Sequence, residues 1–278
     1  MIKISKSRNL FVSTKNYFFE LFDYQTDKLV VTFEPAGQPY ERPQAYRAGW
    51  GSAAFRVRGI SHLCVKPKSV DWYRKPDIVQ GFEFLARRKV FENFDEVITY
   101  GGSMGGFAAM VYADLIGAKT VFAINPQTTM DKSKVPWEDR FERALLYNWK
   151  GPYSDVAEGY MQDVEKFYVC LDRRFPKDWN HMMRLSESVR AKMTVLNFPY
   201  VNHEMPGHMT SIKILTPLME QMVEGNLDLT AFRKKVRERR DLKRYYNTLE
   251  AKERVKKSPL FQSIVAKHKA QSPLIGLT

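Results

Sequence analysis

The sequence predicts an α/β fold in which a mostly parallel central sheet is covered by helices on both faces. Short apolar segments typical of strands alternate along the chain with segments of helical periodicity. A glycine-rich turn at residues 101–106 joins one of these strands directly to a helix. The chain has 278 residues, enough for one domain with a full hydrophobic core and an extension.

The order of the elements follows from apolar periodicity and from the turn residues between them. Strands are expected at residues 16–24, 28–33, 59–65, 97–100, 120–124, 166–171 and 193–198. Helices are expected at 76–93, 104–116, 179–191 and 210–223, with Gly117 ending the second of them. The irregular stretch 127–165 is predicted to be an insertion that overhangs the carboxyl ends of the strands as a lid would.

Composition excludes several classes of protein. Hydrophobic residues make up 44% of the chain and aromatic residues 13%, as in globular proteins. No apolar run is long enough to cross a membrane, and no long apolar segment follows the basic N-terminus, so neither a membrane span nor a secretory signal is predicted. Cys64 and Cys170 fall within apolar strand segments, which favours two free buried thiols, no metal site and a reducing, cytoplasmic setting.

Positive charge is concentrated in the C-terminal part of the chain. The formal net charge is +13, and residues 226–278 hold fourteen basic and five acidic side chains, so this part carries +9 and the rest +4. We therefore divide the chain into a domain of residues 1–225 and a basic helical extension of residues 226–278. The extension is either a solvated helical appendage, packed on the domain or on a second copy, or a docking site for an anionic partner.

The turn at residues 101–106 contains Gly-x-Ser-x-Gly, with Ser103 at its centre. A serine at a sharp strand-to-helix turn has a strained backbone and an exposed hydroxyl, and its neighbours must be small because strand and helix approach closely. The turn also directs the backbone N–H of Met104 toward the reacting centre. A phosphate-binding glycine loop is the weaker interpretation, because neither Gly-Lys-Ser/Thr nor Gly-x-Gly-x-x-Gly is present.

A serine nucleophile needs a histidine base and an orienting carboxylate. Asp172 directly follows the predicted strand 166–171, and His208 follows the strand 193–198 and precedes a predicted helix. The order Ser103, Asp172, His208 is the order typical of this kind of turn. Asp178 is the alternative acid, and His203 is the alternative base or a substrate contact.

Other aromatic and histidine residues are interpreted from their predicted elements. The candidates for a pocket wall are Trp72, Tyr73, Trp137 and Trp149. Packing is the simpler explanation for Trp72 and Tyr73, and anchoring of the insertion explains Trp137 and Trp149 equally well. His62 is expected to be structural because it lies within a strand. His181 and His268 are expected on helices at the surface.

The motifs at residues 101–107, 172–176 and 207–208 make the chain resemble the α/β-hydrolases over roughly residues 16–223. The resemblance implies that Ser103 is the nucleophile, Asp172 the acid and His208 the base. It also implies an oxyanion hole formed by Met104 and the loop after the third strand. Pro35 of that loop has no N–H, so the second donor is Ala36 or Gly37.

These features lead to several functional hypotheses. The first is a serine hydrolase that cleaves an ester or related acyl bond of a small molecule or a saccharide, without a cofactor. A close variant is an acyltransferase or deacylase acting on a saccharide. A non-catalytic binding protein with a polyanion-docking tail is the alternative from another class, and a nucleotide-binding protein is the least favoured. The sequence is compatible with an oligomer.

Overall fold

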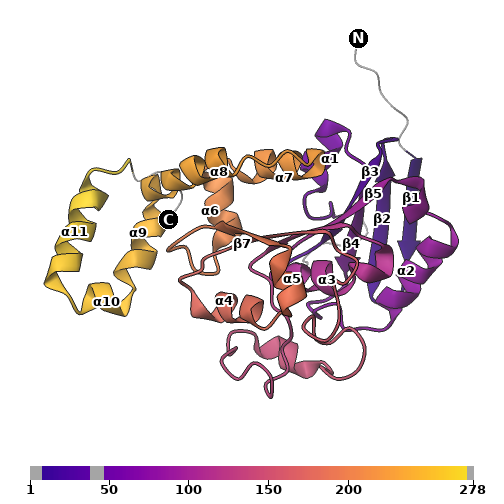
Figure 1. Cartoon of the computed structure of the whole chain (residues 1–278), viewed down its shortest axis with the longest axis horizontal. Coiled ribbons are helices and arrows are strands. Elements are labelled where there is room, and N and C mark those ends of the chain that lie inside the picture. The colour runs from indigo at the N-terminus through magenta and orange to yellow at the C-terminus, as the bar shows by residue number, and fades with distance from the viewer. Residues whose placement is uncertain (1–7, 38–46, 274–278) are drawn as a thin grey trace, which may run out of the picture. The chain divides into compact units, whose positions relative to one another are not determined.

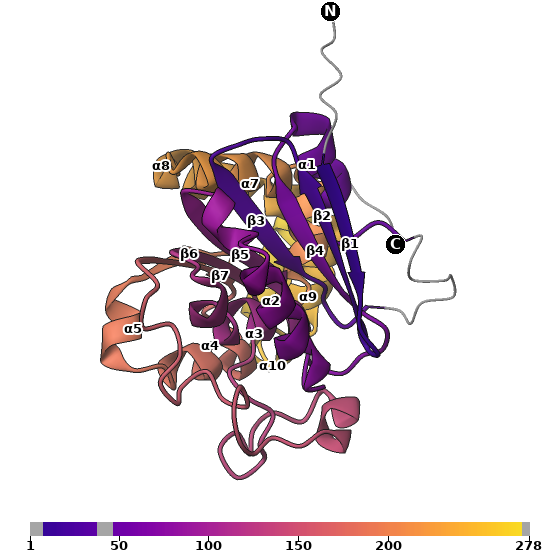
Figure 2. The same cartoon turned by 90° about the vertical axis from the view of Figure 1, so that its right-hand side faces the viewer.

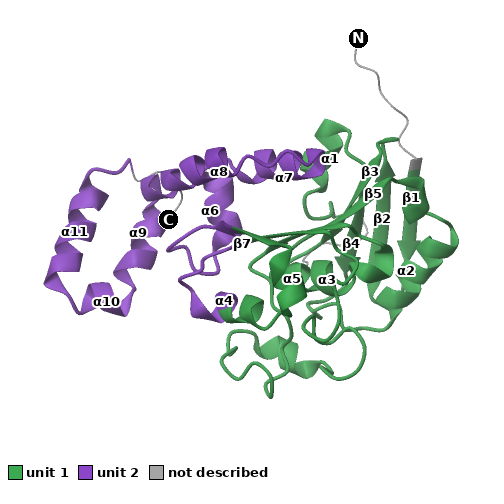
Figure 3. Ribbon diagram, viewed as in Figure 1, with its two compact units in different colours: residues 1–169, 180–195 green, residues 170–179, 196–278 purple. Residues whose placement is uncertain are grey.

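The computed structural model describes residues 8–37 and 47–273. Packing divides the chain into two compact units (Figure 3). Unit 1 comprises Met1–Val169 and Asn180–Val195, and unit 2 comprises Cys170–Trp179 and Leu196–Thr278. The basic tail from residue 226 onward belongs to unit 2, together with the segments that carry Asp172, Asp178, His203 and His208.

An eight-stranded sheet forms the framework, in the order β1-β2-β4-β3-β5-β6-β7-β8 (Figures 1 and 2). Its strands are β1 (Arg8–Ser13), β2 (Tyr17–Asp23), β3 (Lys28–Phe33), β4 (His62–Pro67), β5 (Glu96–Gly102), β6 (Thr120–Ile124), β7 (Lys166–Leu171) and β8 (Met193–Asn197). The pairs β3–β4, β3–β5 and β5–β6 are parallel, whereas β1–β2 and β2–β4 are antiparallel. The predicted mostly parallel sheet is confirmed.

Helices cover both faces of the sheet within unit 1. On one face, Thr99 of β5 donates its hydroxyl to Ala109 O of α3 (Met104–Val111), at 2.8 Å. On the opposite face, the next residue, Tyr100, lies edge-on to Phe55 of α1 (Ser52–Arg58), with ring centroids 6.4 Å apart. Successive residues of a strand point to opposite faces, so a strand covered on both faces is buried along its length, and six of the seven residues of β5 are buried.

The predicted elements of unit 1 agree with the structure in type and differ at their ends. The strand at residues 59–65 begins three residues later, at His62. The helix predicted at 76–93 is α2 (Asp77–Arg87) followed by the 3₁₀ helix η2 (Phe91–Asn93), and the helix predicted at 104–116 is α3 followed by η3 (Asp114–Ile116). Gly117 ends η3 in the left-handed conformation, with φ 67°, as a C-terminal glycine should. β1 and α1 were not predicted.

The second half of the chain departs further from the prediction. The expected helix 179–191 is two helices, α4 (Pro176–Met183) and α5 (Glu187–Ala191), because Ser186 caps a new helix by accepting from Val189 N. The expected helix 210–223 is α6 (Met205–Ser211) and α7 (Leu215–Glu224). The insertion 127–165 contains the 3₁₀ helix η4 (Glu142–Leu146). The tail folds into α8 (Leu229–Lys235), η5 (Val236–Asp241), α9 (Lys243–Glu250), α10 (Glu253–Lys256) and α11 (Pro259–Ala270).

Candidate active site

Ser103 lies at the turn between β5 and α3. Its φ of 50° and ψ of −116° fall outside the regions that a residue with a side chain ordinarily adopts. Two backbone hydrogen bonds hold this conformation: Ser103 N donates to Ile124 O of β6 at 2.8 Å, and Phe107 N donates to Ser103 O at 3.0 Å. The strain predicted for a nucleophile turn is therefore present and is imposed from both sides of the residue.

Two glycines of the turn are required by close backbone contacts. A Cβ atom on Gly101 would lie 2.1 Å from Gly105 O, and one on Gly105 would lie 2.2 Å from Phe33 O and 2.7 Å from Glu34 O. No side chain can relieve these contacts, because the opposing atoms belong to the backbone. The start of α3 therefore lies directly against the end of β3 and the loop that follows it.

Gln127 binds the Ser103 hydroxyl and was not predicted from the sequence. Its Nε2 donates to Ser103 Oγ at 3.3 Å and to Asn125 O at 3.2 Å, while its Oε1 accepts from Trp72 Nε1 at 3.4 Å. The amide is completely buried, so these contacts fix which way it faces. Gln127 follows Asn125-Pro126 at the end of β6, a position that carries no motif in the sequence.

The loop after β3 is held beside the turn by Tyr73. Glu34 N donates to Tyr73 Oη at 2.5 Å, and Tyr73 Oη lies 3.2 Å from Glu34 O. Pro35 has no N–H, and Gly37 N donates to Pro35 O at 2.8 Å. Of the two predicted loop donors, Ala36 is therefore the one whose N–H is not used by this turn.

The four predicted pocket residues have different surroundings. Trp72 and Tyr73 are buried at positive φ, 49° and 56°, and Trp72 lines a pocket of about 310 Å³ together with Ala36, Gly37 and residues of the insertion. Trp149 is buried against Phe107, with ring centroids 5.4 Å apart, and donates Nε1 to Ala144 O. Trp137 lies against His181 with centroids 6.1 Å apart. The contacts of Trp137 and Trp149 thus anchor the insertion.

In unit 2, the two alternative residues form a hydrogen-bonded pair. His203 Nδ1 lies 2.9 Å from each carboxylate oxygen of Asp178. The Asp178 side chain is completely buried, whereas the His203 side chain keeps 25% of its exposure. A carboxylate at Nδ1 stabilises the tautomer with the proton on that nitrogen, and in this tautomer Nε2 is the basic nitrogen of the ring.

The preferred histidine of the sequence prediction has a different environment. His208 lies inside α6, not in a loop before a helix, because Pro206 fits the first turn and the helix begins at Met205. The imidazole is completely buried, and neither of its nitrogens has a hydrogen-bond partner among the residues that the structure describes. Burial, with smaller effects of Arg244 and Arg239, lowers the pKa of His208 to about 3.

The preferred carboxylate of the sequence prediction binds backbone amides. Asp172 accepts from Arg174 N at 2.9 Å, from Val201 N at 3.0 Å and from Asn202 N at 3.1 Å. These bonds join the end of β7 to the loop after β8. Asp172 is therefore in a position to shape the loop that carries His203, one residue beyond Asn202.

Three further histidines had predicted locations. His62 is buried as expected, with Nε2 2.9 Å from Ser52 Oγ and Nδ1 2.8 Å from Ile60 O. His268 is exposed on α11, also as expected. The surface location predicted for His181 is wrong: it is completely buried, because Thr128 and Glu138 of the insertion bind its two ring nitrogens within unit 1.

Cys64 and Cys170 are free and buried, as predicted. In residues 8–37 and 47–273 there is no group of three or more His, Cys, Asp or Glu side chains arranged to hold a metal ion. Over the same described residues, no helix combines the length and the apolar character that crossing a bilayer requires.

Comparison with solved structures identifies the fold. No protein-family model matches the chain, and no curated protein matches its sequence. Among solved structures, the chain is similar to a candidate esterase from Staphylococcus aureus, with 15% identity over 81% of this chain and 85% of that one and a TM-score of 0.54. It is also similar to carboxyl esterase 2 from Tuber melanosporum, with 11% identity, 82% and 89% coverage and a TM-score of 0.53. These likenesses, with the sheet order and the strained serine turn, show that the chain has the α/β-hydrolase fold.

Proposed function

We propose that this protein is a serine hydrolase that cleaves an ester or related acyl bond through an acyl-enzyme at Ser103. The observation that carries the proposal is the strained turn at Ser103, between two glycines that admit no side chain. Backbone strain of this kind persists only where the surrounding structure imposes it, and it is a feature of nucleophile turns.

We assign the base to His203 and the orienting acid to Asp178. Their hydrogen bond gives the imidazole a fixed tautomer, and the partial exposure of His203 leaves the ring accessible to a substrate. The chain order Ser103, Asp178, His203 is the same serine–acid–histidine order as in the first prediction. Asp172 and His208, which the sequence favoured, are better explained as a loop support and a buried neutral imidazole.

The oxyanion donors in this proposal are the backbone N–H groups of Met104 and Ala36. Met104 is the first residue of α3, so its N–H has no acceptor within the helix. The contacts of Gly105 with Phe33 O and Glu34 O support the pairing, because they hold the start of α3 against the loop that contains Ala36. Two donors that are fixed before the reaction stabilise the charge that develops on the carbonyl oxygen.

The reaction then follows from these roles. Ser103 Oγ attacks the acyl carbon while His203 Nε2 takes the hydroxyl proton, and the negative charge collects on the oxygen bound by the two N–H groups. Collapse of the tetrahedral intermediate releases the alcohol, which receives the proton from His203. Water, activated by the same imidazole, attacks the acyl-enzyme and releases the acid. Gln127 holds Ser103 Oγ as an acceptor, so that the hydroxyl proton points away from the buried amide.

Labelling with a fluorophosphonate probe tests the proposal. The wild-type protein should react covalently at Ser103, and Ser103→Ala should not react while keeping the wild-type melting temperature. Absence of labelling in the folded wild type would contradict the proposal and favour a non-catalytic binding protein. Product analysis with p-nitrophenyl acetate, with and without a saccharide acceptor, separates hydrolysis from acyl transfer, because an alcohol can intercept the same acyl-enzyme.

A further inference from the structure

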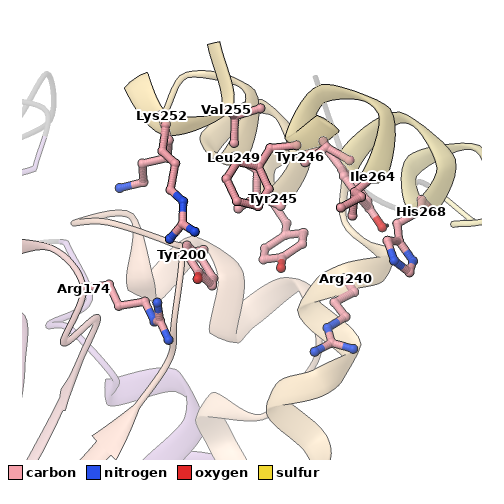
Figure 4. A pocket seen from close by; sticks show the side chains of 13 residues that line it. Arg174, Tyr200, Arg240, Tyr245, Tyr246, Leu249, Lys252, Val255, Ile264 and His268 are labelled. Atoms are coloured by element: carbon pink, nitrogen blue, oxygen red, sulfur yellow. Dashed lines mark hydrogen bonds between the residues drawn. The ribbon is translucent and has the colours of Figure 1, made fainter. Parts of the chain in front are cut away.

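The basic tail encloses a pocket that the hydrolase mechanism does not use. Its volume is about 580 Å³, within the range of small-molecule sites, and all of its lining residues belong to unit 2. The wall formed by α9 and α11 is apolar and aromatic, with Leu249, Tyr246 and Ile264 pointing into the space (Figure 4). Tyr245 and Tyr200 contribute two further rings.

The charged residues around this pocket are all cationic. Arg174, Arg240, Lys252 and Arg254 line it, and no carboxylate does so among the described residues. Figure 4 shows Arg174 and Lys252 toward one end and Arg240 toward the other. Four cations around a mainly apolar space would repel one another in the absence of an anion, so the pocket is complementary to a negatively charged ligand with an apolar body.

Three of the four cations that line the pocket have no acidic partner in residues 8–37 and 47–273. Elsewhere in the tail, Lys269 of α11 pairs with Glu250 of α9 at 2.9 Å, and Lys256 pairs with Glu253 within α10 at 3.4 Å. Within the described part of the chain, Arg174, Arg240 and Arg254 have no carboxylate partner. Three guanidinium groups without a carboxylate partner among the described residues therefore border the pocket, where an anion could bind them.

Two of these guanidinium groups lie over aromatic rings. Arg174 Cζ lies 4.8 Å from the centroid of Tyr200, and Arg254 Cζ lies 4.4 Å from that of Phe261. A cation–π contact restrains the guanidinium group without using its N–H donors, which can then make a bidentate contact with phosphate oxygens. Phosphate is thus the anion that this arrangement fits best.

We propose that this pocket binds a nucleoside diphosphate, with the base between the tyrosine rings and the apolar wall and the phosphates on the arginines. Flat heteroaromatic rings stack on tyrosine, and two phosphates match several unpaired guanidinium groups. The pocket also adjoins the loop that carries His203, because Lys252 Nζ donates to Asn202 Oδ1 at 2.6 Å. Binding does not depend on acyl chemistry at Ser103.

Calorimetric titration with ADP tests the proposal on the full chain. ADP should bind wild type and Ser103→Ala equally. The double variant R240A/R254A should bind at least about tenfold more weakly, because two charge-assisted contacts are lost. The control K256A/K257A removes the same charge from outside the pocket and should change the affinity less than about twofold, since exposed charges act weakly. Equal losses in the two double variants, or no ADP binding up to about 1 mM, would overturn the proposal.

Two further experiments distinguish binding of the whole nucleotide from binding of its phosphates alone or of a lipid surface. Tyr200→Ala should weaken ADP about tenfold and pyrophosphate hardly at all, because base stacking contributes about 1–3 kcal/mol. Equal affinity for pyrophosphate and ADP in the wild type would overturn the nucleotide assignment in favour of phosphate alone. Binding to phosphatidylglycerol vesicles without ADP binding would overturn it in favour of a lipid surface. Melting curves verify that each variant is folded.

Discussion

The serine turn (residues 101–106) and the histidine segment (residues 199–211) achieve their geometry by different means. In the serine turn, backbone atoms of consecutive elements lie so close that only glycine fits at Gly101 and Gly105. In the histidine segment, position depends on hydrogen bonds to residues far away in the sequence, from Val201 and Asn202 to Asp172 and from His203 to Asp178. A steric constraint of this kind can be recognised in the sequence as a pattern of glycines. A hydrogen bond between side chains 25 residues apart produces no recognisable sequence pattern.

The choice between two histidines follows from that difference. His203 and His208 are five residues apart, and both follow β8. Gly207, directly before His208, belongs to α6, and Arg244 Nη1 lies 2.1 Å from where its Cβ would be. The small residue at 207 therefore accommodates Arg244.

The largest expected effect separates the two histidines. His203→Ala should lower kcat/KM for an activated ester by about 10⁴-fold, because the serine loses its base, while the melting temperature changes little. His208→Gln is the matched variant and should keep kcat/KM within about threefold, since a buried neutral ring takes no part in the reaction. Activity lost in His208→Gln and kept in His203→Ala would reverse the assignment. Asp178→Asn should likewise lower kcat/KM strongly, whereas Asp172→Asn should change it little.

The next effect tests the steric constraint of the serine turn. Gly101→Ala should reduce the free energy of unfolding by about 3 kcal/mol or more, because the new methyl group would overlap Gly105 O. Gly102→Ala is the adjacent control, and its Cβ would meet the Trp50 ring at 3.0 Å, which can move, so the expected loss is about 1 kcal/mol. Urea denaturation measures both, and equal losses would refute the close-contact explanation.

A smaller effect is expected at Gln127, which positions Ser103 without touching the substrate. Gln127→Ala should slow fluorophosphonate labelling and kcat together, by about tenfold, with KM unchanged, because one hydrogen bond to Oγ is lost. Gln162→Ala removes an exposed glutamine of the same insertion, whose amide donates to Tyr160 O, and should leave all three quantities unchanged. A change confined to KM would instead indicate a substrate contact.

The features that the sequence predicts correctly are those that depend on local patterns, and the features that it misses depend on contacts between distant residues. The sheet from β2 to β8, the serine turn and the free cysteines could be predicted, because apolar periodicity and steric exclusion are local properties. The role of Gln127 and the burial of His181 could not, because both depend on how the insertion folds back. The Asp178–His203 pair was identified only as an alternative, since strand proximity favoured Asp172 and only the hydrogen bonds of the folded chain distinguish the two carboxylates.

The last effect concerns pH and tests the burial of His208. Because burial lowers the pKa of His208 from 6.5 to about 3, the unfolded chain takes up a proton at this imidazole below pH 6.5 that the folded chain does not. The free energy of unfolding should therefore decrease as pH falls from 6.5 toward 3, by about 2 kcal/mol at pH 5. His208→Gln should lose this part of the acid sensitivity in urea titrations at pH 7 and pH 5. The control His268→Gln, at an exposed position on α11, should retain it, and equal pH slopes in all three proteins would show that His208 is not buried as a neutral group.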